Sequence, residues 1–422
     1  MNVFEAIENE KVLGKNPGVL LSSFPPENKF PHRDQELRQL VMSLQPLLAG
    51  QKAGHVFLFG APGTGKTAIT KYVVESLREQ FDSRGVPFEG VYVDCDQFKK
   101  NTKVFQKIVA DICEKHFMNG EFKIKRTVAG YQLMNLVDTL KNILRVGVVK
   151  NLVIVLDEID VLLNSKDQGD YVIRTLSRLK DEKDIDEKVN IVIVIISNSS
   201  KVREMIRESV WSGFSPTRID FQQYNAPQLT NILLDRAAYA FNDGELEDGA
   251  LQKISAVECS LRRGDARMAL ETLYESYKIS SAQGFVKITV DVVNEAIERT
   301  ETNIFSRSVE LLNKHQRILL LAILQELQRF PTEKLTSVKS FKRYSLICAA
   351  LGETGHEVSE RQLQNILKND FEKLSIVDLE RSWYSPEKKS VNIISFSHSK
   401  NTLHKTLDSL YKEFNFSEEE FK

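Results

Sequence analysis

The segment His55-Val-Phe-Leu-Phe-Gly-Ala-Pro-Gly-Thr-Gly-Lys-Thr67 decides the fold of this chain. Its apolar run 56–59 predicts a buried β-strand, and residues 60–67 match the pattern G-x-x-x-x-G-K-[ST]. A helical pattern follows from Ala68. A strand, a glycine-rich loop and a helix in this order form a phosphate-binding loop, whose backbone N–H groups and helix N-terminus surround an anion. The segment therefore predicts a nucleoside triphosphate site, and an ordinary glycine-rich turn is the alternative.

The residue types in this loop suit phosphate binding individually. Gly63 and Gly65 let the backbone turn inward. Lys66 would place its charge on the β- and γ-phosphates, and the hydroxyl of Thr67 would ligate Mg²⁺. The loop residues expected to contact the nucleotide are Pro62, Gly63, Thr64, Gly65, Lys66, Thr67 and Ala68.

Length and composition limit the class of protein. A chain of 422 residues is too long for one core, so two or three domains are expected. With 42% hydrophobic and 27% charged residues the composition is that of a soluble globular protein, and the net charge of −1 gives no global indication of nucleic-acid binding. Apolar runs such as 191–196 are far too short to cross a bilayer, so no membrane association is expected. The four cysteines form no metal-binding pattern and no signal-peptide core precedes them, which favours a cytoplasmic setting.

A second chemical signal lies at the end of another apolar run. Residues 151–156 predict a buried strand that ends in Asp157 and Glu158. Paired with a phosphate loop, Asp157 would hold Mg²⁺ through water, and Glu158 would orient or deprotonate the attacking water. A buried strand with a chance acidic end is the alternative.

Three further segments complete an expected sheet. Residues 90–94, 191–196 and 218–221 all predict strands. Asn198 follows the second of them, where its amide could reach the γ-phosphate or the attacking water, and a turn residue is the alternative. Since α/β sheets bind ligands at the carboxyl ends of their strands, the sequence predicts an α/β P-loop NTPase domain with a five-stranded parallel sheet.

The segments on either side of this sheet have different patterns. Residues 1–31 contain several Pro and Gly and predict an extended arm. The helix that opens within 31–40 could pack on the adenine or be a plain surface helix. From Gln222 to about Thr300 the pattern is helical, and Arg267 stands in the first turn of one helix. Arg267 could swing onto a phosphate there, or remain a surface residue.

Two lysine-rich stretches could contact nucleic acid. Residues 97–110 contain four lysines and no acidic residue, and Lys123-Ile-Lys-Arg126 follows. Both could contact a phosphate backbone. A solvated helix face is the alternative.

The last hundred residues predict a winged-helix module. Helical patterns over 315–327, 338–351 and 358–370 precede a strand–turn–strand pattern over 375–396. The third helix opens with a capping box at 359–362. One of its faces is apolar, and the opposite face carries the side-chain types that read bases and phosphates, namely Arg361, Gln364, Asn365 and Lys368. Residues 311–410 hold 15 Lys and Arg against 11 Asp and Glu, a modest basic bias, and a winged helix used for protein contacts is the alternative.

Taken together, these motifs resemble those of the archaeal origin-recognition initiators, which are AAA+ ATPases of the origin-recognition-complex and cell-division-control type. The resemblance covers nearly the full length and rests on Pro31-His-Arg33, the phosphate loop, Asp157-Glu-Ile-Asp160, Ser197-Asn198, Gly264-Asp-Ala-Arg267 and Lys314-His-Gln316. It implies an arm over 1–31, an AAA+ domain over 32–222, an α-helical lid over 223–305, a C-terminal winged-helix domain over 306–412 and a tail over 413–422.

The resemblance also assigns roles to single residues. Asn198 resembles the sensor-1 residue and Arg267 the sensor-2 arginine, so both join Lys66, Asp157 and Glu158 as expected catalytic residues. The residues implied to lie around the nucleotide outside the loop are Arg33, Tyr224, Arg236 and Arg267. The family's helical insertion corresponds to 97–126 and lies on DNA, and its wing enters the minor groove. The expected DNA contacts are Lys99, Lys100, Lys103, Lys107, Arg361, Gln364, Asn365, Lys368, Trp383, Lys388 and Lys389.

One departure concerns hydrolysis stimulated by a neighbouring subunit. Where the family carries an arginine that can act as a finger, this chain has Ser209, and only Arg203 or Arg207 lies near enough to substitute.

The resemblance implies an initiator that binds ATP or ADP with Mg²⁺, hydrolyses ATP slowly and grips double-stranded origin DNA in association with the nucleoid. A paralogous initiator and the replicative helicase are the implied partners. A signalling-type ATPase whose winged helix binds protein is the alternative, and a sliding-clamp loader would need a collar domain that the sequence does not indicate.

Overall fold

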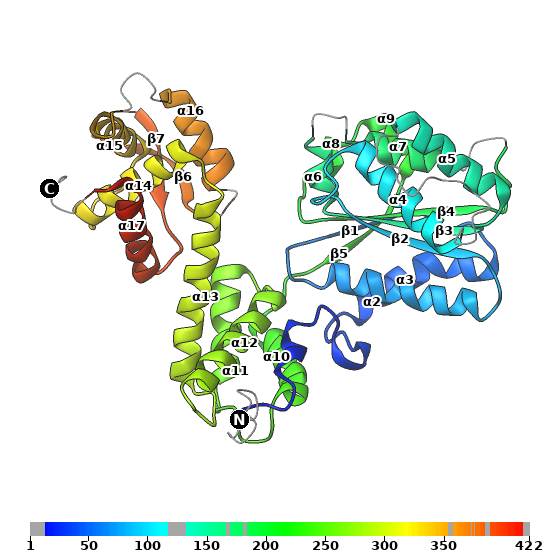
Figure 1. Cartoon of the computed structure of the whole chain (residues 1–422), viewed down its shortest axis with the longest axis horizontal. Helices are drawn as coiled ribbons and strands as arrows, with labels where there is room; N and C mark the ends of the chain where they lie inside the picture. The colour runs from blue at the N-terminus through cyan, green and yellow to red at the C-terminus, as the bar shows by residue number, and fades with distance from the viewer. Residues whose placement is uncertain are drawn as a thin grey trace, which may run out of the picture. The chain divides into compact units, whose positions relative to one another are not determined.

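The computed structural model describes residues 13–116, 132–165, 169–179, 184–352, 358–372, 374, 376–384 and 389–416. For Tyr384 and Lys389 it describes the backbone alone. The chain divides into two compact units, Met1–Tyr274 and Glu275–Lys422 (Figure 1). Among the described residues, no helix has both the length and the apolar character needed to span a bilayer.

The first unit is built on a five-stranded sheet of order β2-β3-β4-β1-β5, in which every pairing is parallel. Every residue of β3 and β4 is buried, as expected for strands covered on both faces. The predicted α/β fold with a five-stranded parallel sheet is therefore confirmed. The strands are β1 (Val56–Gly60), β2 (Phe88–Asp94), β3 (Asn151–Asp157), β4 (Asn190–Ser197) and β5 (Thr217–Phe221).

Successive side chains of each strand point to opposite faces of the sheet, so the strands contribute to two hydrophobic cores. In β3, Val153 and Val155 belong to one core, whereas Leu152, Ile154 and Leu156 belong to the other. Helices α2 (Asp34–Leu44) and α3 (Lys66–Asp82) cover the first face (Figure 1). The helices on the second face are α4 (Asn101–His116), α5 (Leu133–Val146), α6 (Ile159–Leu163), α7 (Tyr171–Arg178), α8 (Val202–Met205) and α9 (Glu208–Phe214).

After β5 the chain turns helical. The lid helices are α10 (Ala226–Ala240), α11 (Ala250–Arg262) and α12 (Ala266–Ala282). Residues 13–31, expected to be extended, instead form two 3₁₀ helices, η1 (Pro17–Leu21) and η2 (Pro26–Asn28). This arm packs on α10, because the N–H groups of Lys15 and Asn16 donate to the carbonyl of Ala240 at 2.9 and 3.1 Å. A third short helix, η3 (Gln45–Ala49), follows α2.

The second unit contains the predicted winged helix, which is confirmed. Helix α14 is its central element, with residues 318–325 all buried. The third helix, expected to be regular over 358–370, begins as α16 and continues as a π-helical turn. The elements are α13 (Val290–Glu310), α14 (Lys314–Arg329), α15 (Ser337–Ala350), α16 (Glu360–Asn365), the π turn η5 (Ile366–Phe371), β6 (Asp378–Tyr384), β7 (Lys389–Ser395) and α17 (Lys400–Phe414).

Candidate functional site

The phosphate loop connects the end of β1 to the start of α3 in a conformation that requires glycine. Gly63 and Gly65 have φ angles of 68° and 92°, in the left-handed region that L side chains rarely adopt. The buried Thr64 hydroxyl donates to the carbonyl of Ala61 at 2.8 Å and closes the loop. Pro62 is exposed on the loop, and Ala68 lies in the first turn of α3.

Lys66 is buried and points back into this loop. Its Nζ donates to the carbonyls of Gly60 and Ala61, both at 2.7 Å, and to Oδ1 of Asn198 at 2.8 Å. Burial lowers the pKa of Lys66 to about 8, although the charge of Asp157 opposes the shift. The structure thus brings together two predicted site residues, Lys66 and Asn198, that are far apart in the sequence.

Asp157, at the end of β3, is the centre of a second polar cluster. Its Oδ2 accepts from Thr67 Oγ1 at 2.7 Å and from the phenol of Tyr92, and its Oδ1 accepts from the N–H of Glu158 at 2.9 Å. Burial, reinforced by the charge of Asp157, raises the pKa of Tyr92. Sequence reasoning missed Tyr92, because only the register of β2 against β3 brings it here.

Glu158 follows in a left-handed backbone conformation, with φ of 52°. Non-glycine residues in this region are uncommon and gather at functional sites. Partial burial, and then the neighbouring Asp157, raise the pKa of Glu158. The next acidic residue, Asp160, accepts a hydrogen bond from Ser197 Oγ and so ties α6 to the end of β4.

The loop before α12 contacts the phosphate loop. Gly63 lies so close to Asp265 that a Cβ at residue 63 would be 1.9 Å from Asp265 Oδ1. The N–H of Ala266 donates to the carbonyl of Gly63 at 3.3 Å. Arg267 is exposed, and its positive charge adds to the effect of burial on the Lys66 pKa. The structure thus places Arg267, a predicted site residue, where its charge acts on Lys66.

Arg33 and Arg236, which were expected around the nucleotide, both donate to backbone carbonyls. Arg33 is 3% exposed, and its guanidinium donates to the carbonyls of Thr64 at 2.9 Å and Gln222 at 2.5 Å. It also lies 3.9 Å from the ring centroid of Tyr224. Arg236 is buried in α10 and donates to carbonyls of the arm, at 2.9 Å for Val19. These contacts hold the phosphate loop, the start of the lid and the arm in place.

Tyr224 approaches the loop from the lid side. Its phenol donates to the carbonyl of Thr64 at 3.4 Å. Gly264 packs against its backbone, where a Cβ would lie 2.1 Å from the Tyr224 carbonyl oxygen. A side chain at residue 264 would therefore separate the lid loop from Tyr224.

At the expected finger position, Ser209 is exposed on α9. Arg207 donates from Nε and Nη2 to the buried carboxylate of Asp170 at 2.6 and 2.8 Å. Arg203 pairs with Glu208 and lies 5.0 Å from the Trp211 ring centroid. Both guanidinium groups are thus engaged within the chain.

The third winged-helix helix exposes the polar face predicted for it. Leu363 and Leu367 are buried, whereas Arg361, Asn365 and Lys368 are exposed. Gln364 accepts a hydrogen bond from Asn392 Nδ2 of β7 at 2.9 Å. Between this helix and the hairpin lies a cavity of about 490 Å³ that Arg381, missed in the sequence, also lines.

The wing itself is partly described. Trp383 is 66% exposed at the end of β6. Lys388 lies outside the described residues, and only the backbone of Lys389 is described. These residues stay predictions.

The lysines of the second predicted DNA surface lie on and before α4. Lys99, Lys100 and Lys103 are exposed, and Lys107 pairs with Asp111 at 2.8 Å. The opposite face of α4 is buried against the sheet. The basic stretch 123–126 lies outside the described residues.

Comparison with known proteins accounts for most of the chain. Residues 29–194 match the AAA ATPase domain family, 230–298 the Cdc6 AAA+ ATPase-type lid domain and 307–406 the CDC6 C-terminal winged helix domain. The ORC1-type DNA replication protein of Thermococcus kodakarensis is 30% identical over 89% of this chain and 86% of its own. ORC1-type DNA replication protein 1 of Archaeoglobus fulgidus is 30% identical over 90% and 87%.

Among solved structures, the Aeropyrum pernix ORC1 protein in complex with DNA is similar over 94% of this chain and 97% of its own. The TM-score is 0.74 and the sequence identity 25%. The similarity thus extends through the sheet domain, the lid and the winged helix.

Proposed function

This chain belongs to the ORC1-type DNA replication protein family, and from that premise we propose that it is an ATP-binding replication initiator that grips double-stranded origin DNA. The observation that carries the proposal is the polar cluster behind the phosphate loop. There Lys66 is held by Asn198, and Thr67 is held by Asp157. This is the set of groups that contacts the phosphates and Mg²⁺ of a bound nucleoside triphosphate.

The groups of this site fit the cofactor by their chemistry. Mg²⁺ prefers oxygen ligands and keeps several waters, and the hydroxyl of Thr67 with the carboxylate of Asp157 offers such oxygens. Bound Mg²⁺ would neutralise charge on the phosphate oxygens. Lys66 would exchange its carbonyl partners for phosphate oxygens, and the loop N–H groups would bind the same anion.

In hydrolysis, Glu158 would orient or deprotonate the attacking water, and Asn198 would hold that water or the γ-phosphate. Arg267 would reach the γ-phosphate from the lid. Because Asp265 and Ala266 already touch Gly63, a change at the phosphates would move the loop that begins α12. Slow hydrolysis would then change the position of the lid once per ATP, rather than drive repeated cycles of movement.

We propose that DNA meets the winged helix through the face that carries Arg361, Asn365 and Lys368. The similar ORC1 protein of Aeropyrum pernix is in complex with DNA, which supports DNA binding by a chain of this fold, and the exposed polar side chains favour this face. Gln364 and the wing would add contacts, and the exposed lysines before and on α4 would contact phosphates. With few arginines on the recognition face, we expect phosphate contacts and DNA deformation to supply most of the affinity.

A paralogous initiator on the same origin and the replicative helicase are the proposed protein partners. With Ser209 at the finger position and Arg207 bound to Asp170, this chain would not supply a finger to a neighbour.

Duplex binding measured by fluorescence anisotropy across a range of salt concentrations tests the proposal. We expect tighter binding to origin duplex than to random duplex, and log affinity that falls linearly with log salt concentration. The alternative, a signalling-type ATPase whose winged helix binds protein, predicts ATP binding with no affinity for either duplex.

A further inference from the structure

The carboxylate of Asp157 accepts hydrogen bonds from three different parts of the first unit. Thr67 donates from the phosphate-binding helix at 2.7 Å, and Tyr92 donates to the same oxygen, Oδ2. The N–H of Glu158 donates to Oδ1 at 2.9 Å. An ionised carboxylate offers about four lone-pair sites. The chain itself therefore takes up most of them, and about one is left for a cation or its bound water.

Tyr92 is held in position by its strand. In the parallel pairing of β2 with β3, Tyr92 lies opposite Val155 and Asp94 lies opposite Asp157. The ring therefore lies alongside the strand that ends in Asp157. β2 is an edge strand next to β3, and the Tyr92 ring packs with the core on the α3 face of the sheet. The phenol and the Thr67 hydroxyl therefore reach the carboxylate from the same face of the sheet, one from β2 and the other from α3.

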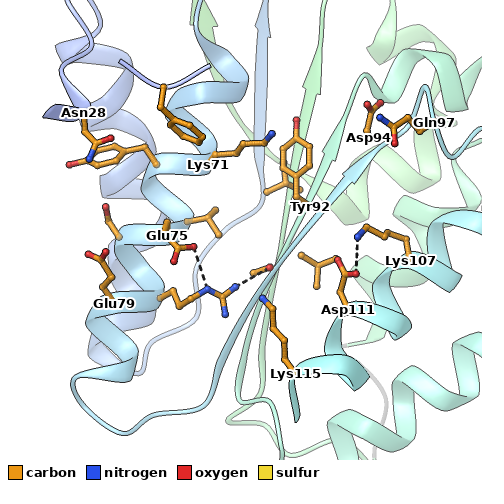
Figure 2. A pocket seen from close by; sticks show the side chains of 18 of the residues that line it. Asn28, Lys71, Glu75, Glu79, Tyr92, Asp94, Gln97, Lys107, Asp111 and Lys115 are labelled. Atoms are coloured by element: carbon orange, nitrogen blue, oxygen red, sulfur yellow. Dashed lines mark hydrogen bonds and ion pairs between the residues drawn. The ribbon is translucent and has the colours of Figure 1, made fainter. Parts of the chain in front are cut away.

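A lysine on α3 fixes the ring from its face. Lys71 Nζ lies 4.3 Å from the centroid of the Tyr92 ring, and Figure 2 shows the ammonium group pointing toward that ring. A cation at this distance over an aromatic face is attracted to it. Both side chains line a cavity of about 850 Å³ beside β2.

We propose that Tyr92 is a positioning residue for magnesium, and that its phenol fixes the Asp157 carboxylate with its open lone pair directed at the cation. The proposal rests on the proposed function, because it takes that cation to arrive with ATP. Without the phenol, the carboxylate would keep two donors, Thr67 on Oδ2 and the N–H of Glu158 on Oδ1. A second donor on the same oxygen, supplied by β2 rather than by α3, restricts the carboxylate further before the cation binds, as outer partners of metal ligands commonly do.

Tyr92→Phe tests this role, because it keeps the ring and its contact with Lys71 and removes the hydroxyl alone. Affinity for a fluorescent ATP analogue is measured with Mg²⁺ and, separately, with EDTA. We expect the Kd with Mg²⁺ to rise about tenfold and the Kd with EDTA to change by less than about twofold.

Tyr72→Phe is the matched control. Tyr72, on α3, lines the same cavity as Tyr92. Its ring lies against Phe30 instead, with centroids 5.4 Å apart. We expect both of its Kd values to equal those of the wild type. Thermal unfolding of each variant checks that the fold is intact.

A double-mutant cycle with Asp157→Asn sharpens the test. If the phenol acts through the carboxylate, Tyr92→Phe should add no further loss of Mg²⁺-dependent affinity in the Asp157→Asn background. The proposal would be overturned if the ratio of the two Kd values in Tyr92→Phe equals that of the wild type, whether neither value rises or both rise by the same factor. Failure of the wild type to bind ATP under either condition would contradict the proposed function itself.

Discussion

The nucleotide site and the winged-helix surface present their polar side chains in opposite ways. In the nucleotide site Lys66 and Asp157 are buried, and each is bound by several groups of the chain before any ligand arrives. On the winged helix Arg361, Asn365 and Lys368 are exposed. Buried, mutually bonded groups act as a unit, whereas exposed charges act nearly independently and are screened by salt. One substitution should therefore disable the first region and only weaken the second.

The largest effect is expected when the lysine of the phosphate loop is removed. Lys66→Ala should weaken ATP binding by about a hundredfold or more, because charge-assisted hydrogen bonds contribute roughly 1.5–3 kcal/mol each. Duplex binding should remain measurable, since the winged helix is left intact. Equilibrium titration with a fluorescent ATP analogue gives the first value, and anisotropy with labelled duplex gives the second.

Lys253→Ala, which removes an exposed lysine of α11, is the control and should bind ATP as the wild type does. Normal ATP binding by Lys66→Ala would show that the site has been assigned to the wrong residues.

The protonation of Lys66 provides a second, smaller effect. Burial lowers its pKa to about 8 in the free protein, and bound phosphates would favour the charged form and raise that pKa. The affinity for ATP is then highest below pH 8, where Lys66 is protonated, and it falls as the pH rises through that value. Between pH 7 and pH 9 we expect about a tenfold loss, because one proton is linked to binding.

Calorimetry in buffers of different ionisation enthalpy measures that proton directly. At pH 8 we expect uptake of about half a proton per ATP bound. Glu158→Gln should give the same uptake, because the proton is assigned to Lys66. Binding of ATP without proton uptake would show that Lys66 does not contact the phosphates.

On the winged helix the expected effects are smaller and add together. Arg361→Ala and Lys368→Ala should each weaken duplex binding severalfold and lower the slope of log affinity against log salt concentration by about one. The double variant should show the sum of both losses, because independent exposed sites are additive. A salt slope equal to that of the wild type would place this face away from DNA. Lys253→Ala again serves as the control.

The sequence predicts those features that depend on neighbouring residues and misses those that depend on contacts between distant parts of the chain. The phosphate loop, the strand ending in Asp157 and the polar face of the third winged-helix helix were predictable, because each depends on residue spacing along a few turns or one strand. Tyr92 and the Asp265–Gly63 contact were not, since they depend on strand register and on packing of the lid loop. Nothing in the sequence indicated that the guanidinium of Arg33 donates to the carbonyls of Thr64 and Gln222. The π turn after Asn365 has no periodic signal of its own.

The central claim is that one chain joins a nucleotide switch to a duplex-binding domain. The most direct measurement is the affinity of the full chain for origin duplex with Mg²⁺ and either ATP or ADP, in the wild type and in Lys66→Ala. The account predicts that the wild type has two different affinities and that Lys66→Ala has one affinity in both nucleotides. Equal affinities in the wild type, or no duplex binding at any salt concentration, would contradict it.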